Sequence, residues 1–102
     1  MSPDQREFLN LIHLPAVLTR EQAGWVLGYT PVEIDILRSA GVIAALGRPK
    51  RNSRKVYMRE EIMKLQQDKR LLDRAQVAIS NYWERKNASR RLETNELTES
   101  EN

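Results

Sequence analysis

Residues Thr19–Gly41 read TREQAGWVLGYTPVEIDILRSAG and decide the fold, because they contain two short helical patterns separated by three residues. Thr19 and Thr30 each precede a Gln or Glu by three positions, which is the spacing of a capping box at the start of a helix. Gly28 and Gly41 follow the two patterns, where helices commonly end in a left-handed residue. Each helix therefore has a start and a stop, and the pair predicts a helix-turn-helix.

The composition restricts what can be built on this unit. The chain has 102 residues, no cysteine and a single histidine, His13, so we expect one small domain without disulfides, metal or cofactor. No Ser-His-Asp set or phosphate-binding glycine loop is present, which predicts a binding protein and not an enzyme. The chain does not begin with a basic region and an apolar run, and no apolar stretch reaches membrane length. We therefore expect a cytoplasmic protein with no membrane partner.

The positive charge is concentrated directly after the helix pair. The formal net charge is only +3, but residues 48–59 hold six bases and no acid. Two β-compatible runs, VIAAL at 42–46 and KVYM at 55–58, flank this segment and predict a two-stranded β-hairpin. A charge run alone usually marks a solvated face. At the tip of a hairpin joined to a helix-turn-helix, it predicts contact with the phosphate backbone of double-stranded DNA. The bases are Arg48, Lys50, Arg51, Arg54, Lys55 and Arg59.

The second helix, expected from Pro31 to Ala40, presents few polar side chains. At 100° per residue, its apolar residues, Val32 and Ala40 included, spread around the inner arc, while the outer arc carries Asp35, Arg38 and Ser39. Arg38 is placed to bind guanine with both arms of its guanidinium, and Ser39 to donate to a base or phosphate. Asp35 is expected either to accept from a cytosine amine or to pair with Arg38. Tyr29 and Thr30 at the helix entrance complete this candidate DNA-binding surface.

These residues resemble a known family. LTREQAGWVLGYTPVEIDILRSAGVI, followed by a basic loop and RKVYMREEIMKL, is similar to the winged helix-turn-helix of excisionases and of MerR-type regulators. The matching features cover about residues 18 to 66 and are Leu18-Thr19, Ala23, Leu27-Gly28, the capped second helix, Gly41-Val42-Ile43, Arg54 and Tyr57. The resemblance implies that the second helix enters the major groove and that the basic hairpin is the wing. It also implies a role as a small transcription regulator or an excision-type accessory factor.

The flanking segments predict further helices. Ser2-Pro3-Asp4 begins a helix expected over residues 3–12, and Trp25 is expected to pack on a neighbouring element or to contact a partner. From Glu60 onward no Gly or Pro occurs, which predicts one long helix to about Ala88. This helix either dimerises or folds back on residues 3–12. The residues expected in a homodimer contact are Leu72, Ala75, Ile79, Tyr82 and Trp83.

The complete prediction is a mainly α chain, with a small winged helix-turn-helix, a β-hairpin wing and a long C-terminal helix. Residues 1–17 hold the first helix, 18–66 the winged domain, 67–91 the possible dimerisation helix and 92–102 a disordered acidic tail. A second function remains open. The chain also fits a protein-interaction adaptor with weak or no sequence-specific DNA binding. Its contact would be either the apolar second helix, with acidic Asp35, or the Tyr82-Trp83 surface.

Overall fold

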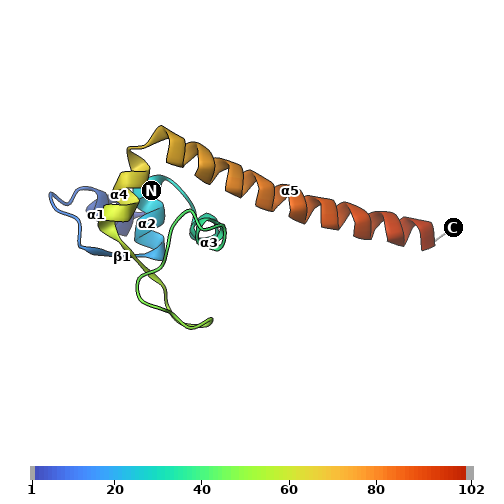
Figure 1. The fold of residues 1–102 in the computed structure, drawn as a ribbon, viewed down its shortest axis with the longest axis horizontal. Helices are drawn as coiled ribbons and strands as arrows, with labels where there is room; N and C mark the ends of the chain where they lie inside the picture. The colour runs from blue at the N-terminus through green and yellow to red at the C-terminus, as the bar shows by residue number, and fades with distance from the viewer. Residues whose placement is uncertain (1, 101–102) are drawn as a thin grey trace.

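The computed structural model describes residues 2–100, with side chains through Arg90. The described part is mainly helical with one small antiparallel sheet of two strands, as expected from the sequence (Figure 1). None of the helices in the searched part of the chain combines the length and apolarity needed to cross a membrane. In chain order the elements are α1 Pro3–Leu9, β1 Val17–Thr19, α2 Arg20–Leu27, α3 Pro31–Ser39, β2 Val56–Met58, α4 Arg59–Gln66 and α5 Lys69–Ser100.

The α2–α3 pair forms as predicted. The hydroxyls of Thr19 and Thr30 accept hydrogen bonds from the backbone N–H groups of Gln22 and Glu33, whose side chains accept from the cap backbone in return. Gly28 ends α2 at a φ of 81°. The turn also needs a glycine earlier in α2, because a Cβ at Gly24 would stand 2.4 Å from the carbonyl oxygen of Tyr29. Gly24 thus allows the chain to fold back tightly between the two helices.

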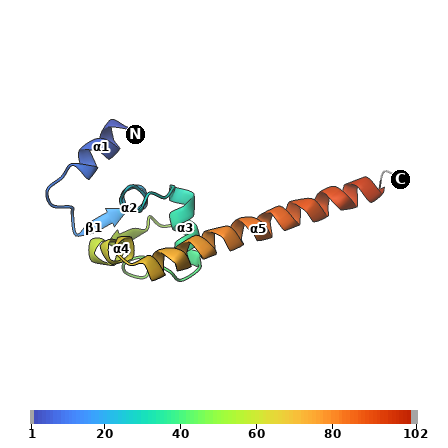
Figure 2. The same ribbon diagram turned by 90° about the horizontal axis from the view of Figure 1, so that it is seen from above.

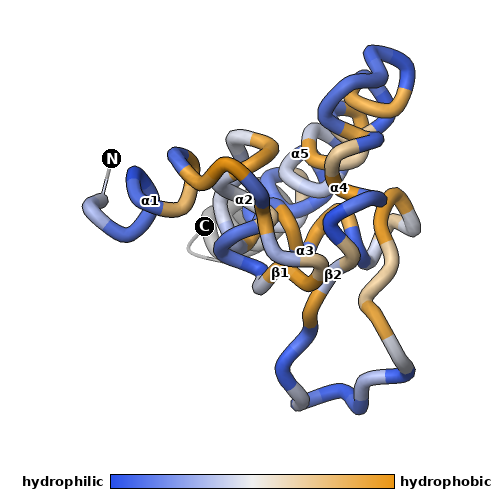
Figure 3. The backbone as a smooth tube through the Cα atoms, turned by 90° about the vertical axis from the view of Figure 1, so that its left-hand side faces the viewer, coloured by the Kyte–Doolittle hydropathy of each residue, from blue (hydrophilic) through white to orange (hydrophobic). Residues whose placement is uncertain are grey.

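The predicted β-hairpin between residues 42–46 and 55–58 is wrong, because the second run pairs with a different strand. β2 pairs with β1, the strand directly before α2, with Leu18 opposite Tyr57. Both of these side chains are buried, so the pairing is set by the core. Residues 42–46 form no strand, and Leu46 N–H donates to the Val56 carbonyl at 2.8 Å. That bond closes residues 47–55 into a polar loop, named here the basic loop, which extends away from the body (Figure 3).

The sequence predicted one long C-terminal helix, but the structure contains two. α4 ends at Gln66, and α5 begins at Lys69 in a new direction (Figure 1). The Asp68 carboxylate accepts from the backbone N–H groups of Arg70 and Leu71 at 3.0 and 3.3 Å, which is the role of an N-cap. The break coincides with the thinnest part of the apolar pattern, so no core contact opposes it.

The core joins all the helices to one body. Leu18, Ile34, Leu37, Tyr57 and Ile62 are its largest fully buried side chains. α1 is shorter than predicted, ending at Leu9 and not at residue 12, and it packs on α2. Its Phe8 meets Trp25 edge to face with ring centroids 5.5 Å apart, which confirms the packing role for Trp25.

α5 packs on α3 and α4 and then projects beyond them (Figures 1 and 2). It does not fold back on α1, contrary to one of the two predicted alternatives. The projection gives the molecule extents of 63 × 31 × 28 Å. The disordered acidic tail predicted for residues 92–102 overlaps the end of this helix, which extends through Ser100. No Gly or Pro interrupts the helix. The last two residues of that tail lie outside the described part.

Candidate nucleic-acid interface

A cleft of about 530 Å³ lies between the helix pair and the basic loop. One wall comes from the start of α2 and the outer face of α3, and the other comes from the basic loop. Five of the lining side chains are basic and two are acidic, so the cleft is positive overall. The lining residues are Arg20, Glu21, Asp35, Arg38, Arg51, Ser53, Arg54 and Lys55.

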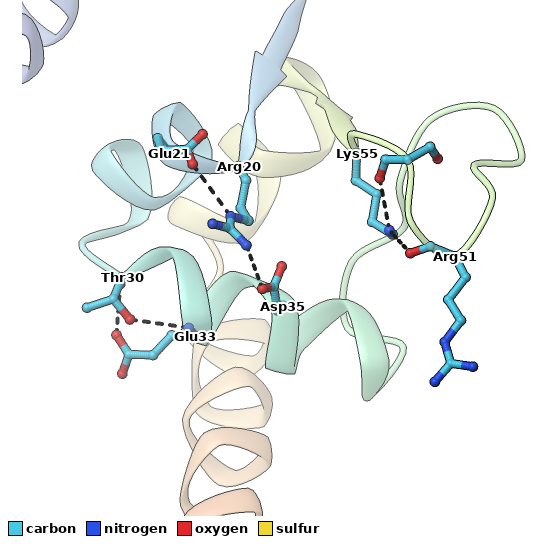
Figure 4. A network of polar contacts seen from close by, with 8 residues as sticks. Arg20, Glu21, Thr30, Glu33, Asp35, Arg51 and Lys55 are labelled. Carbon is cyan, nitrogen blue, oxygen red and sulfur yellow. Dashed lines mark hydrogen bonds and ion pairs between the residues drawn. The ribbon is translucent and has the colours of Figure 1, made fainter.

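The basic loop is shaped by its own side chains. Lys55 directs its ammonium inward and donates to the carbonyls of Arg51 and Ser53, both at 3.1 Å (Figure 4). The Ser53 hydroxyl and backbone N–H both donate to the Lys50 carbonyl, at 2.8 and 3.0 Å. These bonds satisfy backbone carbonyls that a protruding loop would otherwise leave to water. Within the described part of the chain, the guanidinium groups of Arg51 and Arg54 make no hydrogen bond or ion pair and remain available to a ligand.

The helix wall of the cleft carries an ion pair between the two helices. Arg20 Nη1 lies 2.8 Å from Asp35 Oδ2, and Arg20 Nε lies 3.6 Å from Glu21 Oε1 (Figure 4). Pairing with Arg38 was one of the two roles predicted for Asp35, and that alternative is wrong. Pairing with Arg20 compensates the one acidic charge on the outer face of α3. Asp35 therefore repels an incoming phosphate less than its sequence position suggests.

Arg38 lies at the inner side of the cleft, next to a buried tyrosine. Burial raises the pKa of the Tyr57 phenol above its ordinary value of 10.0, and the nearby Arg38 and Arg20 charges oppose that rise while Asp35 adds to it. Arg38 is thus close enough to act on the phenol. Even so, among the described residues neither Arg38 Nε nor the Tyr57 hydroxyl has a partner at hydrogen-bonding geometry, although both atoms are buried.

Several predicted site residues lie away from the cleft. The Tyr29 hydroxyl donates to Gln76 on α5 at 3.4 Å, and burial, followed by the Glu33 charge, raises its pKa above 10.0. The Thr30 hydroxyl is used as the α3 cap. Arg59 ties β2 to the chain before β1, with Nη1 donating to the Leu14 carbonyl at 2.6 Å. Ser39, Arg48 and Lys50 are exposed but do not line the cleft.

The cleft also contains residues that the sequence analysis did not include, namely Arg20, Glu21 and Ser53. Arg20 and Asp35 are 15 positions apart, beyond the reach of any helical spacing rule. One signal was present in the sequence. Asp35 is an acid on the outer face of α3, and Arg20 at the start of α2 is a base that a helix-turn-helix brings next to it.

The residues predicted for dimerisation divide into two groups. Ala75 and Ile79 are buried in the core of the single chain and keep almost no surface for the predicted dimer contact, whereas Leu72 and Tyr82 are only partly buried against that core. They are used inside the monomer because α5 lies against α3. Trp83 is 38% exposed, and Lys86 Nζ lies 5.5 Å from its ring centroid.

The resemblance to excisionases and MerR-type regulators stays a prediction. The features quoted for it do occur in the structure, including the two capped helices and the buried tyrosine of β2. The expected hairpin wing is replaced by a loop closed on the β1–β2 sheet. Comparison of the chain with protein-family models, curated proteins and solved structures gives no match, so the chemistry of the cleft residues carries the assignment of function.

Proposed function

We propose that this chain is a DNA-binding protein without catalytic activity, in which α3 docks in the major groove of duplex DNA and the basic loop contacts the phosphate backbone. Its biological role would be that of a small regulator or an accessory factor in recombination. The proposal depends mainly on one observation, the positive cleft of about 530 Å³ in which a basic loop faces a helix-turn-helix.

The arrangement of charge supports a polyanionic partner. Arg51 and Arg54 are exposed and make no ion pair with a described residue, while the acid across the cleft, Asp35, is compensated by Arg20. Arginines on a protruding loop bind phosphate oxygens and release counterions from the duplex, which gives affinity without reading sequence.

The first test is fluorescence anisotropy with a random duplex of about thirty base pairs, titrated with salt. We expect log K to fall against log salt with a slope of about −4 to −6, because each neutralised phosphate contributes about 0.9. Absence of binding at low salt would refute the proposal.

Charge reversal at the cleft separates specific geometry from net charge. Arg51→Glu/Arg54→Glu should abolish detectable binding or reduce it by at least about a hundredfold at low salt. The matched control is Arg70→Glu/Arg74→Glu, which changes the charge equally at exposed positions early in α5, far from the basic loop (Figures 1 and 3). Equal losses in the two double variants would show that only the net charge matters.

A second candidate, a protein-interaction adaptor, is favoured by exposed apolar side chains. Val32 was expected on the inner arc of α3, yet it is 50% exposed, and Ile12 after α1 is 93% exposed. The sequence analysis placed the adaptor contact on the apolar second helix, to which Val32 belongs. The duplex titration discriminates the two functions, since an adaptor of this kind would bind random DNA weakly or not at all.

A further inference from the structure

The helix wall of the cleft contains one guanidinium whose charge is not used by the described residues. Arg38 makes no ion pair and no hydrogen bond of good geometry with these residues, although it lies near the Tyr57 hydroxyl, and of its three nitrogens only Nε is buried without a partner. The two Nη groups are therefore reached by solvent from the cleft that Arg38 lines. An arginine held in this way offers the planar, two-pronged donor that matches an oxyanion.

The other cleft bases differ from Arg38 in one respect. Arg20 is engaged by Asp35 and Glu21, and Lys55 is engaged by two loop carbonyls. Arg51 and Arg54 are unengaged but belong to an exposed loop. Arg38 alone combines an uncommitted charge with a position on a helix that is packed into the core.

The recessed position of Arg38 decides which part of DNA it can reach. A side chain that reads base edges must project from the helix to the floor of the major groove. Arg38 Nε is instead buried beside β2, which keeps the guanidinium close to the surface of α3. A phosphate group is the part of DNA that can enter a cleft between two basic walls.

Tyr57 lies behind Arg38 with an unsatisfied hydroxyl. The residue is 1% exposed, and its neighbours include Arg38, Asp35 and Arg20, all of which line the cleft. A buried polar atom without a partner is costly, so a small movement that joins Arg38 Nε–H to the hydroxyl oxygen is favoured. That bond would fix the guanidinium with its Nη groups toward the cleft.

We propose that Arg38 binds one phosphate group in the cleft through its Nη groups, with Tyr57 beneath it as a positioning residue. This inference rests on the proposed function, in which the phosphate belongs to the DNA backbone. It replaces the expectation that Arg38 contacts guanine. The shared chemistry is that of a tetrahedral phosphate oxyanion, which inorganic phosphate also supplies.

The first measurement uses inorganic phosphate and the whole protein. In ¹H–¹⁵N spectra, the Arg38 Nε–H resonance should shift in a saturable way with phosphate, at an ionic strength held constant with chloride. Arg74 Nε–H, on exposed α5, is the internal control and should not shift. Tyr57→Phe keeps the ring in the core and should weaken phosphate binding about threefold while altering the Arg38 Nε–H shift before any phosphate is added.

The second measurement uses two duplexes of unrelated sequence. Arg38→Gln should weaken both by the same factor, at least about tenfold, and make the salt slope shallower by about 0.9. Arg38→Lys keeps the charge and should restore the slope but only part of the affinity. Arg74→Gln is the matched control and should leave both quantities unchanged.

The outcomes separate the two proposals. Duplex binding that loses its sequence preference in Arg38→Gln, with an unchanged slope, would make Arg38 a base-reading residue and overturn the inference alone. Duplex binding that is indifferent to Arg38 and Tyr57, with no saturable phosphate shift, would also overturn it. If the wild-type protein binds no duplex yet shows the Arg38 phosphate shift, the proposed function fails, and the site is one for a smaller phosphate-bearing ligand.

Discussion

Asp35 shows how one contact changes the meaning of a residue. A carboxylate on the outer face of α3 would repel DNA phosphates and so argues against DNA binding. The 2.8 Å contact with Arg20 compensates that negative charge. The side chains of Arg20 and Asp35 are 43% and 35% exposed, so the pair contributes at most about 1 kcal/mol to stability. Its larger effect is on the electrostatic potential of the cleft.

Asp35→Asn should therefore leave the free energy of unfolding within about 1 kcal/mol of wild type. Affinity for a random duplex at low salt should rise about fivefold, because one close negative charge is worth roughly 1 kcal/mol in water. Glu33→Gln is the control, since it removes the same charge from α3 outside the cleft and keeps an acceptor for the cap. Weaker binding in Asp35→Asn would instead show that the carboxylate contacts DNA.

A glycine is required at position 24 because of a close contact with the Tyr29 carbonyl, and not because of its own backbone conformation. Gly24→Ala should lower the free energy of unfolding by about 2–3 kcal/mol, because the new methyl would overlap the Tyr29 carbonyl at 2.4 Å. Gly47→Ala, at a φ of 70° with open space around it, should cost only about 1 kcal/mol. Urea denaturation of both variants measures this, and equal costs would contradict the close contact.

At the scale of elements, Asp68 separates α4 from α5 and so directs α5 onto α3. Asp68→Ala should cost about 1 kcal/mol through the lost cap, while Asp68→Asn should cost little. Asp73→Ala is the control, because it breaks a solvent-exposed pair with Lys69 that contributes little to stability. If Asp68→Ala matched this control in urea denaturation, the division of the helix would not depend on the cap.

The basic loop is an element made by tertiary pairing. β1 and β2 hold its neighbours, and the Leu46–Val56 hydrogen bond closes it. A hairpin was expected because two β-compatible runs flank the bases, and that local reasoning could not detect a better partner before α2. The loop lies beside the helix pair, with which it lines the cleft, but the second strand of the predicted hairpin is absent.

At the scale of the whole molecule, positive and negative charges are concentrated in different segments of the chain. Residues 48–59 hold six bases, whereas residues 93–102 hold four acids and no base. Ending the chain at residue 92 should strengthen binding to random duplex several-fold at low salt, because it removes negative charge without touching the cleft. The gain should vanish at high salt, where screening is strong. Anisotropy at two salt concentrations measures this, and unchanged low-salt affinity would show that the acidic end has no influence on binding.

The sequence alone determined the helix-turn-helix, because capping boxes and terminal glycines act over three or four residues and are visible as local patterns. It also determined that six bases lie together in residues 48–59. Only the tertiary structure decided which strand pairs with Val56–Met58, that Arg20 compensates Asp35, that Arg38 lies against Tyr57 and that α5 packs on α3. These contacts join residues 15 or more positions apart. Their partners are selected by burial in a shared core, which no local spacing records.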